Sequence, residues 1–250
     1  AIREAAIEAL RRYGPHAAGA STGAGATPLS RALEETVAGF LGMQDALLYP
    51  GGWAAGYGLI RALVRSADHV VIDSLAHSAL QDGALAATRN VAHFRHRDVE
   101  HCRRLLTQIR ARDAENGVLI VAESLNAAQS DVADIAGLQA LAREFGATLA
   151  LDVSQDLGCM GADGRGALGA QAMAGKVDLV IGSFSKSFAA NGGFVAMREG
   201  AIKEYLRFYG PTQAFSSALS PAQTAAALKA FEIVAADEGR HLRARLALSL

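Results

Sequence analysis

Short apolar runs alternate with longer amphipathic segments along most of the chain. The short runs are rich in Val, Ile and Leu and lie at residues 45–49, 69–73, 117–123, 147–153, 177–183 and 193–197. The amphipathic segments, whose apolar residues recur with a helical period, lie at residues 28–42, 53–64, 98–112 and 135–146. Buried strands that alternate with helices are typical of an α/β domain with a mainly parallel sheet.

The same pattern divides the chain into three parts. Residues 1–27 form an N-terminal segment, the alternation fills residues 28–215, and the strand signals cease from about residue 220. Residues 216–250 predict one long helix, which would lead to a small C-terminal domain that the chain does not contain. The chain starts without Met and stops inside a helical pattern, so we expect a fragment of a longer protein.

Composition and charge narrow the class of partner. The chain has 250 residues, of which 51% are hydrophobic and 20% charged, and its formal net charge is −1. This charge gives no general attraction to nucleic acid, and no apolar stretch approaches the roughly 18 residues of a membrane-spanning helix. Two cysteines are too few for a disulfide framework. We therefore expect a soluble, cytoplasmic protein whose partners are small molecules or proteins.

Polar residues follow the predicted strands at the point where each strand ends. In open α/β sheets ligands bind beyond the carboxyl ends of the strands, so these residues are candidates for a site. They are Asp73, His77, Glu123, Asp152, Gln155, Ser183, Ser185 and Lys186. Gly51, Gly52 and Trp53 stand at the start of a predicted helix, where a glycine turn offers backbone amides to an anion.

An anion site, a strand-end aspartate and a lysine after the next strand suggest pyridoxal phosphate. Lys186 would form the Schiff base, Asp152 would keep the pyridine nitrogen protonated, and the helix N-terminus would take the phosphate. Each feature alone has a plainer interpretation: a capping aspartate, a glycine turn, and a helix-capping histidine at His77. A second histidine group comprises His93, His96 and His101. It adjoins a charged helix without a nearby cysteine, so we predict no metal site there.

The order of the motifs resembles that of the α-oxoamine synthases, fold-type I pyridoxal-phosphate enzymes that include serine palmitoyltransferase and aminooxononanoate synthase. The resemblance runs from about residue 20 to the end of the chain. Its segments are YPGGWAAG at 49–56, DSLAHSALQDG at 73–83, DVSQDLGCMGADGRG at 152–166, GSFSKSFAANGGF at 182–194 and FSSALSP at 215–221.

The resemblance implies a role for each candidate residue. Residues 28–215 would be the PLP-binding large domain, with Lys186 as the Schiff-base lysine, Asp152 at the pyridine nitrogen and His77 stacked on the ring. Residues that would contact the rest of the cofactor are Gly52, Trp53 and Ser183 at the phosphate and Gln155 at the phenolic oxygen. In a homodimer, Ser217 would reach the phosphate held by the partner subunit.

The implied reaction is a decarboxylative condensation. A small α-amino acid (Ser, Gly or Ala) would react with an acyl thioester, carried by coenzyme A or a carrier protein, to give an α-amino ketone. The alternatives are a PLP-dependent aminotransferase and a non-catalytic subunit of a heteromeric synthase. The arginine that binds the substrate carboxylate in the family lies beyond residue 250.

Several positions depart from the family pattern. Gln155 replaces a histidine, Ala127 replaces a serine near the ring, and Ser30 replaces another histidine. Gln129 and Ser130 replace the usual Asp-Gly of the same loop as Ala127. The Gln155 amide can still donate a hydrogen bond to the cofactor, but it cannot titrate. These departures bear on the choice of substrate and on the level of activity, and they leave the expected cofactor unchanged.

Overall fold

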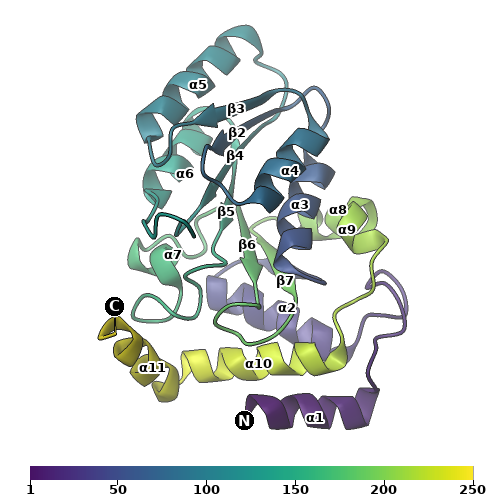
Figure 1. The fold of residues 1–250 in the computed structure, drawn as a ribbon. Helices are drawn as coiled ribbons and strands as arrows, with labels where there is room; N and C mark the ends of the chain where they lie inside the picture. Colours follow the sequence, from purple (N-terminus) through teal and green to yellow (C-terminus); the bar gives the residue numbers. More distant parts are fainter. Residues whose placement is uncertain (250) are drawn as a thin grey trace.

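Seven strands form one sheet in the order β1–β7–β6–β5–β4–β2–β3 (Figure 1). The computed structural model describes residues 1–249. The strands are β1 (Asp45–Tyr49), β2 (His69–Asp73), β3 (Val91–Phe94), β4 (Val118–Glu123), β5 (Thr148–Asp152), β6 (Leu179–Ser183) and β7 (Gly193–Met197). Strands β2 to β6 pair in parallel, whereas β7 is antiparallel to both of its neighbours. The predicted α/β fold with a mainly parallel sheet is confirmed.

Helices connect the strands and cover both faces of the sheet. They are α1 (Ile2–Tyr13), α2 (Pro28–Leu41), α3 (Gly52–Leu63), α4 (Ser78–Ala87), α5 (Val99–Arg112), α6 (Ile135–Glu144), α7 (Gly166–Ala170), α8 (Gly200–Tyr209), α9 (Pro211–Ala214), α10 (Pro221–Ala235) and α11 (Asp237–Ala247). The N-terminal helix α1 lies along α10, far from it in sequence (Figure 1).

Alternating residues of the central strands build two apolar cores. In β4, Leu119 and Val121 pack with residues of α3 and α4 on one face of the sheet. Their neighbours Ile120 and Ala122 pack with residues of α2, α5, α6 and α10 on the other face. Because helices bury both faces, the strand sequences read as continuous apolar runs.

Helix α2 shows how local sequence sets a boundary. Thr27 Oγ1 accepts the Ser30 backbone N–H at 3.1 Å, and Ser30 Oγ accepts the Thr27 backbone N–H at 2.9 Å. Pro28 occupies the first helical position, where its missing N–H is not needed. Ser30, one of the departures from the family pattern, therefore closes a reciprocal cap.

The parallel strands bring four polar residues to one edge of the sheet. Strand β2 ends at Asp73, β4 at Glu123, β5 at Asp152 and β6 at Ser183. Glu123 and Asp152 are paired residues in the register of their two strands. The site residues predicted from strand ends therefore share one edge, as expected for parallel strands.

Two features differ from the sequence-based prediction. Strand β3 was not predicted, because its residues are half-exposed and carry His93 rather than a continuous apolar run. The single long helix predicted from residue 216 is wrong: it is divided into α10 and α11 at Ala236, whose ψ is 175°. Gly239 packs against the end of α10 so closely that a Cβ there would lie 2.4 Å from the Ile233 carbonyl oxygen. Residue 250 lies outside the described residues.

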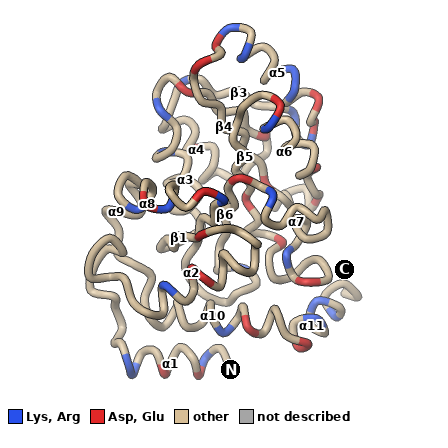
Figure 2. The backbone as a smooth tube through the Cα atoms, turned by 180° about the vertical axis from the view of Figure 1, so that it is seen from behind, with Lys and Arg blue, Asp and Glu red and all other residues tan. Residues whose placement is uncertain are grey.

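The described chain carries its charges in a mixed pattern. Figure 2 shows basic and acidic positions interspersed along helices such as α1 and α11. Within residues 1–249, every helix is too short or too polar to cross a membrane.

Candidate functional site

A cavity of about 220 Å³ opens at the shared edge of β4, β5 and β6. The residues that line it are Gly52, Trp53, His77, Glu123, Asp152, Ser154, Gln155, Ser183, Ser185 and Lys186. Of the residues to which the motif comparison gave a role, it brings together all but Ser217, which is exposed and lies outside this cavity. Asp73 and Gly51, which the strand ends and the glycine turn also suggested, are not part of the lining.

Lys186 lies in the segment that joins β6 to β7. Phe184 and Phe188, both fully buried, anchor this segment on either side, while Lys186 itself is exposed toward the cavity. Across residues 1–249, no hydrogen bond or ion pair engages the Lys186 amine. The amine is therefore free to react with a ligand.

Glycines let the start of α3 approach β6 and β7. A Cβ at Gly52 would lie 2.6 Å from the Cβ of Ser183, and one at Gly193 would lie 2.7 Å from the Gly51 carbonyl oxygen. Gly51, as the residue before α3, has no side chain to cap the first backbone amides. These amides and the Ser183 hydroxyl, which lies 2.7 Å from the Ser185 hydroxyl, form a cluster of donors suited to a phosphate.

Asp152 lies at the floor of the cavity, at the end of β5. Its Oδ1 accepts the Ser154 backbone N–H at 2.8 Å. Desolvation raises the pKa of Asp152, although the Ser154 hydrogen bonds and the nearby His77 and Lys186 lower it. A buried carboxylate of this kind gains most from a cationic partner, such as a protonated ring nitrogen.

His77 and Glu123 meet at the rim of the cavity. The His77 backbone N–H donates to Glu123 Oε2 at 3.1 Å, and its ring Nδ1 accepts the Ala79 N–H at 3.2 Å at the start of α4. Burial and the charge of Asp152 raise the pKa of Glu123 to about 7. His77 is thus a helix-capping histidine, the plainer of its two interpretations, and it also lines the cavity.

Glu123, Ser154 and Ser185 line the cavity although the motif comparison gave them no role. All three stand at the end of a predicted strand or just after one, but Ser154 was not counted among the candidates. Ser154 is brought in by the hydrogen bond from its backbone to Asp152. Gln155 lines the cavity as predicted from its place in the aspartate motif.

The residues of the cavity fit pyridoxal phosphate. Its aldehyde requires an amine, its pyridine nitrogen a carboxylate, and its phosphate a cluster of N–H and O–H donors. In one cavity, Lys186 supplies the amine and Asp152 the carboxylate. The donors for the phosphate lie where Gly52 approaches Ser183.

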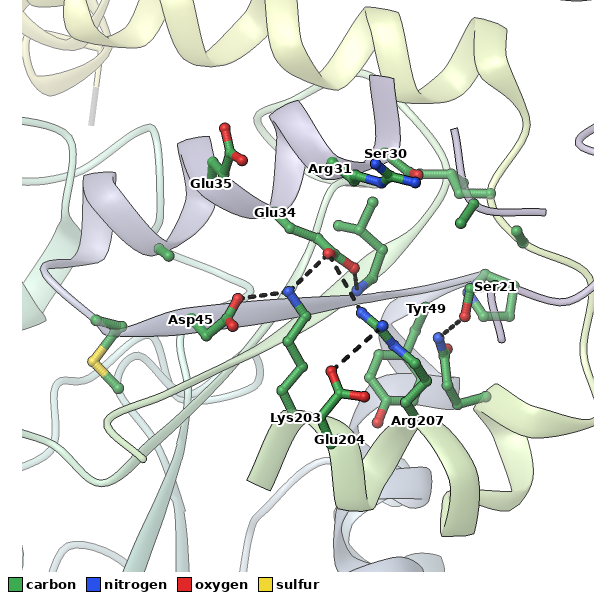
Figure 3. Close-up of a pocket in the computed structure, with 18 of the residues that line it drawn as sticks. Ser21, Ser30, Arg31, Glu34, Glu35, Asp45, Tyr49, Lys203, Glu204 and Arg207 are labelled. Atoms are coloured by element: carbon green, nitrogen blue, oxygen red, sulfur yellow. Dashed lines mark hydrogen bonds and ion pairs between the residues drawn. The ribbon is translucent and has the colours of Figure 1, made fainter. Parts of the chain in front are cut away.

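A larger cavity, of about 750 Å³, lies at the β1 edge between α2 and α8 (Figure 3). Here Lys203 is held between Glu34 at 2.9 Å and Asp45 at 2.6 Å, and Arg207 faces Glu34 and Glu204. Burial raises the pKa of Glu34, while Lys203 lowers it. Lys203, Glu34 and Asp45 neutralise one another, so these three groups form a structural network.

The three histidines considered as metal ligands have separate partners. His93 Nε2 lies 3.0 Å from Gln81 Oε1, and His101 Nδ1 accepts the Arg95 N–H at 2.9 Å. His96 is placed between two aspartates. In the described part of the chain, no group of three or more His, Cys, Asp or Glu residues has the arrangement of a metal site.

Comparisons with known proteins agree on one family. The family described as "Aminotransferase class I and II" matches residues 1–249. An 8-amino-7-oxononanoate synthase of Geobacter metallireducens is 35% identical over 246 residues, which are 98% of this chain and 62% of the relative. A serine palmitoyltransferase of Bacteroides thetaiotaomicron is 31% identical over 233 residues, 93% of this chain and 58% of the relative.

Solved structures agree as well. A serine palmitoyltransferase from S. paucimobilis, with a bound PLP–myriocin aldimine, matches with a TM-score of 0.92 and 27% identity. The match covers 99% of this chain and 61% of that one. The chain spans less than two thirds of the length of each of these relatives.

Proposed function

The chain belongs to the aminotransferase class I and II family, its relatives are the α-oxoamine synthases that its motif order predicts, and from this premise we propose that it is a PLP-dependent acyltransferase. The observation that carries the proposal is the convergence of a free Lys186 amine and the Asp152 carboxylate on one cavity. The family binds PLP, which supplies an electron sink for the bond broken at the substrate α-carbon.

In this proposal most residues that line the cavity have a task. Lys186 would hold the cofactor through its amine and would move the proton at the substrate α-carbon. Asp152 holds the ring nitrogen protonated, and His77 packs on the ring. Gly52, Trp53 and Ser183 bind the phosphate through backbone amides and a hydroxyl, and Gln155 donates to the phenolic oxygen. Ser217 would contact the phosphate of the cofactor that a partner subunit binds.

The proposed reaction joins a small α-amino acid (Ser, Gly or Ala) to an acyl thioester with loss of carbon dioxide. The names of the relatives support this choice, because 8-amino-7-oxononanoate synthases and serine palmitoyltransferases are both acyl-transferring synthases. The acyl donor would be acyl-coenzyme A or an acyl carrier protein. We assign residues 28–215 to the PLP-binding domain and residues 216–250 to the connection toward a further domain.

The family description itself supports a second candidate, an aminotransferase. The two reactions differ in the fate of the amino group. We expect carbon dioxide to be released from carboxyl-labelled serine, glycine or alanine only when an acyl-coenzyme A is added. An aminotransferase would instead consume the cofactor aldehyde with the amino acid alone. It would release no carbon dioxide with any acyl thioester tested.

We further propose that the chain forms a homodimer. Large aromatic side chains are exposed near the start of α3 and on α8 and the segment after α9: Trp53, Tyr205, Phe208, Tyr209 and Phe215. Phe215, which is 92% exposed, adjoins the segment with Ser217. Such a surface is typical of an interface. We expect a dimeric mass by light scattering and a monomeric mass for Phe208→Lys with Tyr209→Lys; a monomeric wild type would exclude the dimer.

A further inference from the structure

His96 bridges two carboxylates outside the cavity lining. Its Nδ1 lies 2.8 Å from Asp73 Oδ1, and its Nε2 lies 2.9 Å from Asp131 Oδ1. The imidazole is mostly buried, with 20% of its side chain exposed. The two aspartates come from different segments, one from the end of β2 and the other from the loop after β4.

This geometry requires a doubly protonated ring. An ionised carboxylate only accepts hydrogen bonds, so both nitrogens of His96 must donate. Burial lowers the pKa of His96, but its hydrogen bonds to Asp73 and Asp131 outweigh burial and hold that pKa above the ordinary value of 6.5. Below this raised pKa the ring is therefore an imidazolium with two charge-assisted hydrogen bonds.

Each carboxylate holds a loop that borders the Lys186 cavity. Asp73 Oδ1 also accepts the Leu75 N–H at 2.9 Å, which fixes the turn that leads to His77. The Asp131 backbone carbonyl accepts the Asn126 N–H at 2.9 Å, which closes the loop of residues 124–132. The His96 ring thus links the two loops to each other.

Asn126 extends this link to the cavity. Its Nδ2 donates to the Leu75 carbonyl at 3.0 Å and to Glu123 Oε2 at 3.1 Å. The same Glu123 oxygen accepts the His77 N–H. A movement of either loop would therefore shift both His77 and Glu123, which line the cavity.

Other charged groups face the two carboxylates. The Arg97 N–H donates to Asp73 Oδ2 at 3.1 Å, and its guanidinium lies 3.4 Å from Asp131 Oδ2. Cys102 of α5 is fully buried, and burial together with Asp73 raises the pKa of its thiol to about 12, so it stays neutral. Among the described groups that contact the two carboxylates, His96 changes charge near neutral pH. Glu123, which accepts the His77 N–H and whose pKa is raised to about 7, titrates in the same range, so the pH dependence of the His77 amide is compared with that in Glu123→Gln.

We propose that His96 is a positioning residue, whose imidazolium clamps the turn of residues 73–77 to the loop of residues 124–132 and so holds His77 and Glu123 at the cavity. The importance of the clamp for cofactor binding rests on the proposed function. The clamp itself is a property of the chain and can be measured without the cofactor.

The first test follows the ring and the loops in the cofactor-free protein by NMR. We expect the His96 imidazole to titrate above pH 6.5. As the ring loses its proton, the backbone amides of Leu75, His77 and Asn126 should exchange faster, after correction for the intrinsic pH dependence of exchange. His96→Gln should accelerate exchange of these three amides by about tenfold or more at pH 6, because a neutral amide cannot donate to both aspartates in this geometry.

Three further variants keep the test decisive. Asp131→Asn should accelerate exchange of the same amides. The double variant, His96→Gln with Asp131→Asn, should exchange no faster than either single variant, because both changes break one clamp. His93→Gln is the control. It should leave exchange of these amides unchanged, because His93 is exposed and contacts Gln81 rather than Asp73 or Asp131. An ordinary or lowered His96 pKa, or unchanged exchange in His96→Gln, would overturn the clamp.

The second test measures binding of pyridoxal phosphate to the 250-residue chain by absorbance. We expect His96→Gln to weaken binding by about fivefold to tenfold near pH 6.5, and we expect the gap to narrow above the His96 pKa, where the wild type also loses its clamp. Equal affinities at all pH values would overturn the positioning role. A wild type that binds no pyridoxal phosphate would overturn the proposed function, while the exchange data would still decide the clamp.

Discussion

Two lysines of this chain lie in cavities, and their surroundings differ in almost every respect. Lys203 is 12% exposed and is held by the carboxylates of Glu34 and Asp45 in the larger cavity. Lys186 is exposed toward the smaller cavity and is free of ionic partners among the described residues. A lysine whose charge is already neutralised stabilises the fold, whereas an unpaired amine beside polar groups can serve a ligand.

Cavity size alone would favour Lys203, whereas the strand ends and the free amine favour Lys186. The cavity around Lys203 holds about 750 Å³ and that around Lys186 about 220 Å³. The smaller one lies at the carboxyl ends of parallel strands, where loops bring chemistry from several strands together. The following predictions test this contrast.

The largest effect is expected for Lys186→Ala. Removal of the amine should abolish covalent attachment of pyridoxal phosphate, measured by borohydride reduction and peptide mapping. Lys203→Met is the matched control, because its side chain is engaged elsewhere, and it should retain the label at Lys186. A label on Lys176, Lys203 or any other lysine would contradict the assignment.

Asp152→Asn should come next in size. A neutral amide cannot hold the ring nitrogen protonated, so turnover should fall by about 10²-fold or more while the fold is retained. The measurement is the rate of product formation at saturating cofactor, with circular dichroism as the check on folding. A loss below about threefold would mean that Asp152 does not face the ring nitrogen.

Lys203→Met tests the structural half of the contrast. It leaves Glu34 buried without its main cation, so the free energy of unfolding in urea should fall by about 3 kcal/mol. Lys229→Met, which removes a surface pair with Glu232, should cost less than about 0.5 kcal/mol. Adding Glu34→Gln to Lys203→Met should recover part of the loss; equal effects of the two lysine variants would refute the buried network.

The smallest effect concerns Glu123 and pH. Its pKa is raised from 4.5 to about 7 in the folded chain, so its contribution to stability is fully present below about pH 4.5 and is lost as the pH rises toward 7. Glu123→Gln keeps an acceptor for His77 without this charge. Between pH 5 and 8 the wild type should therefore lose about 2 kcal/mol relative to the variant in cofactor-free urea titrations. Parallel pH profiles would show that burial does not perturb Glu123.

The sequence predicted which residues line the smaller cavity better than it predicted the contacts that hold the surrounding segments in place. Asp152, Ser183 and Lys186 could be placed together because each follows a buried apolar run, and parallel strands end at one edge. The six predicted strands are present within two residues of their expected bounds. Local periodicity and strand order suffice for this level of description.

Contacts between distant segments could not be predicted in this way. The Lys203–Glu34 pair joins α8 to α2, and the His96–Asp131 pair joins the end of β3 to the loop after β4. Neither pair has a sequence spacing that signals it, because both depend on how helices and loops pack. The break at Ala236 was missed because the apolar pattern continues across it, although Gly239 packs against Ile233 at the junction of the two helices.

The place of β1 in the sheet has a consequence for the order of folding. This strand joins the sheet only through β7, with Asp45 opposite Met197. A chain that emerges from the ribosome N-terminus first must wait for β7 before β1 can pair, and closing so long a loop is slow. Until then β1 is an unpaired apolar strand open to aggregation. We therefore expect the Gly51–Gly52 turn, which follows β1, to meet Ser183 only after β7 is available for pairing.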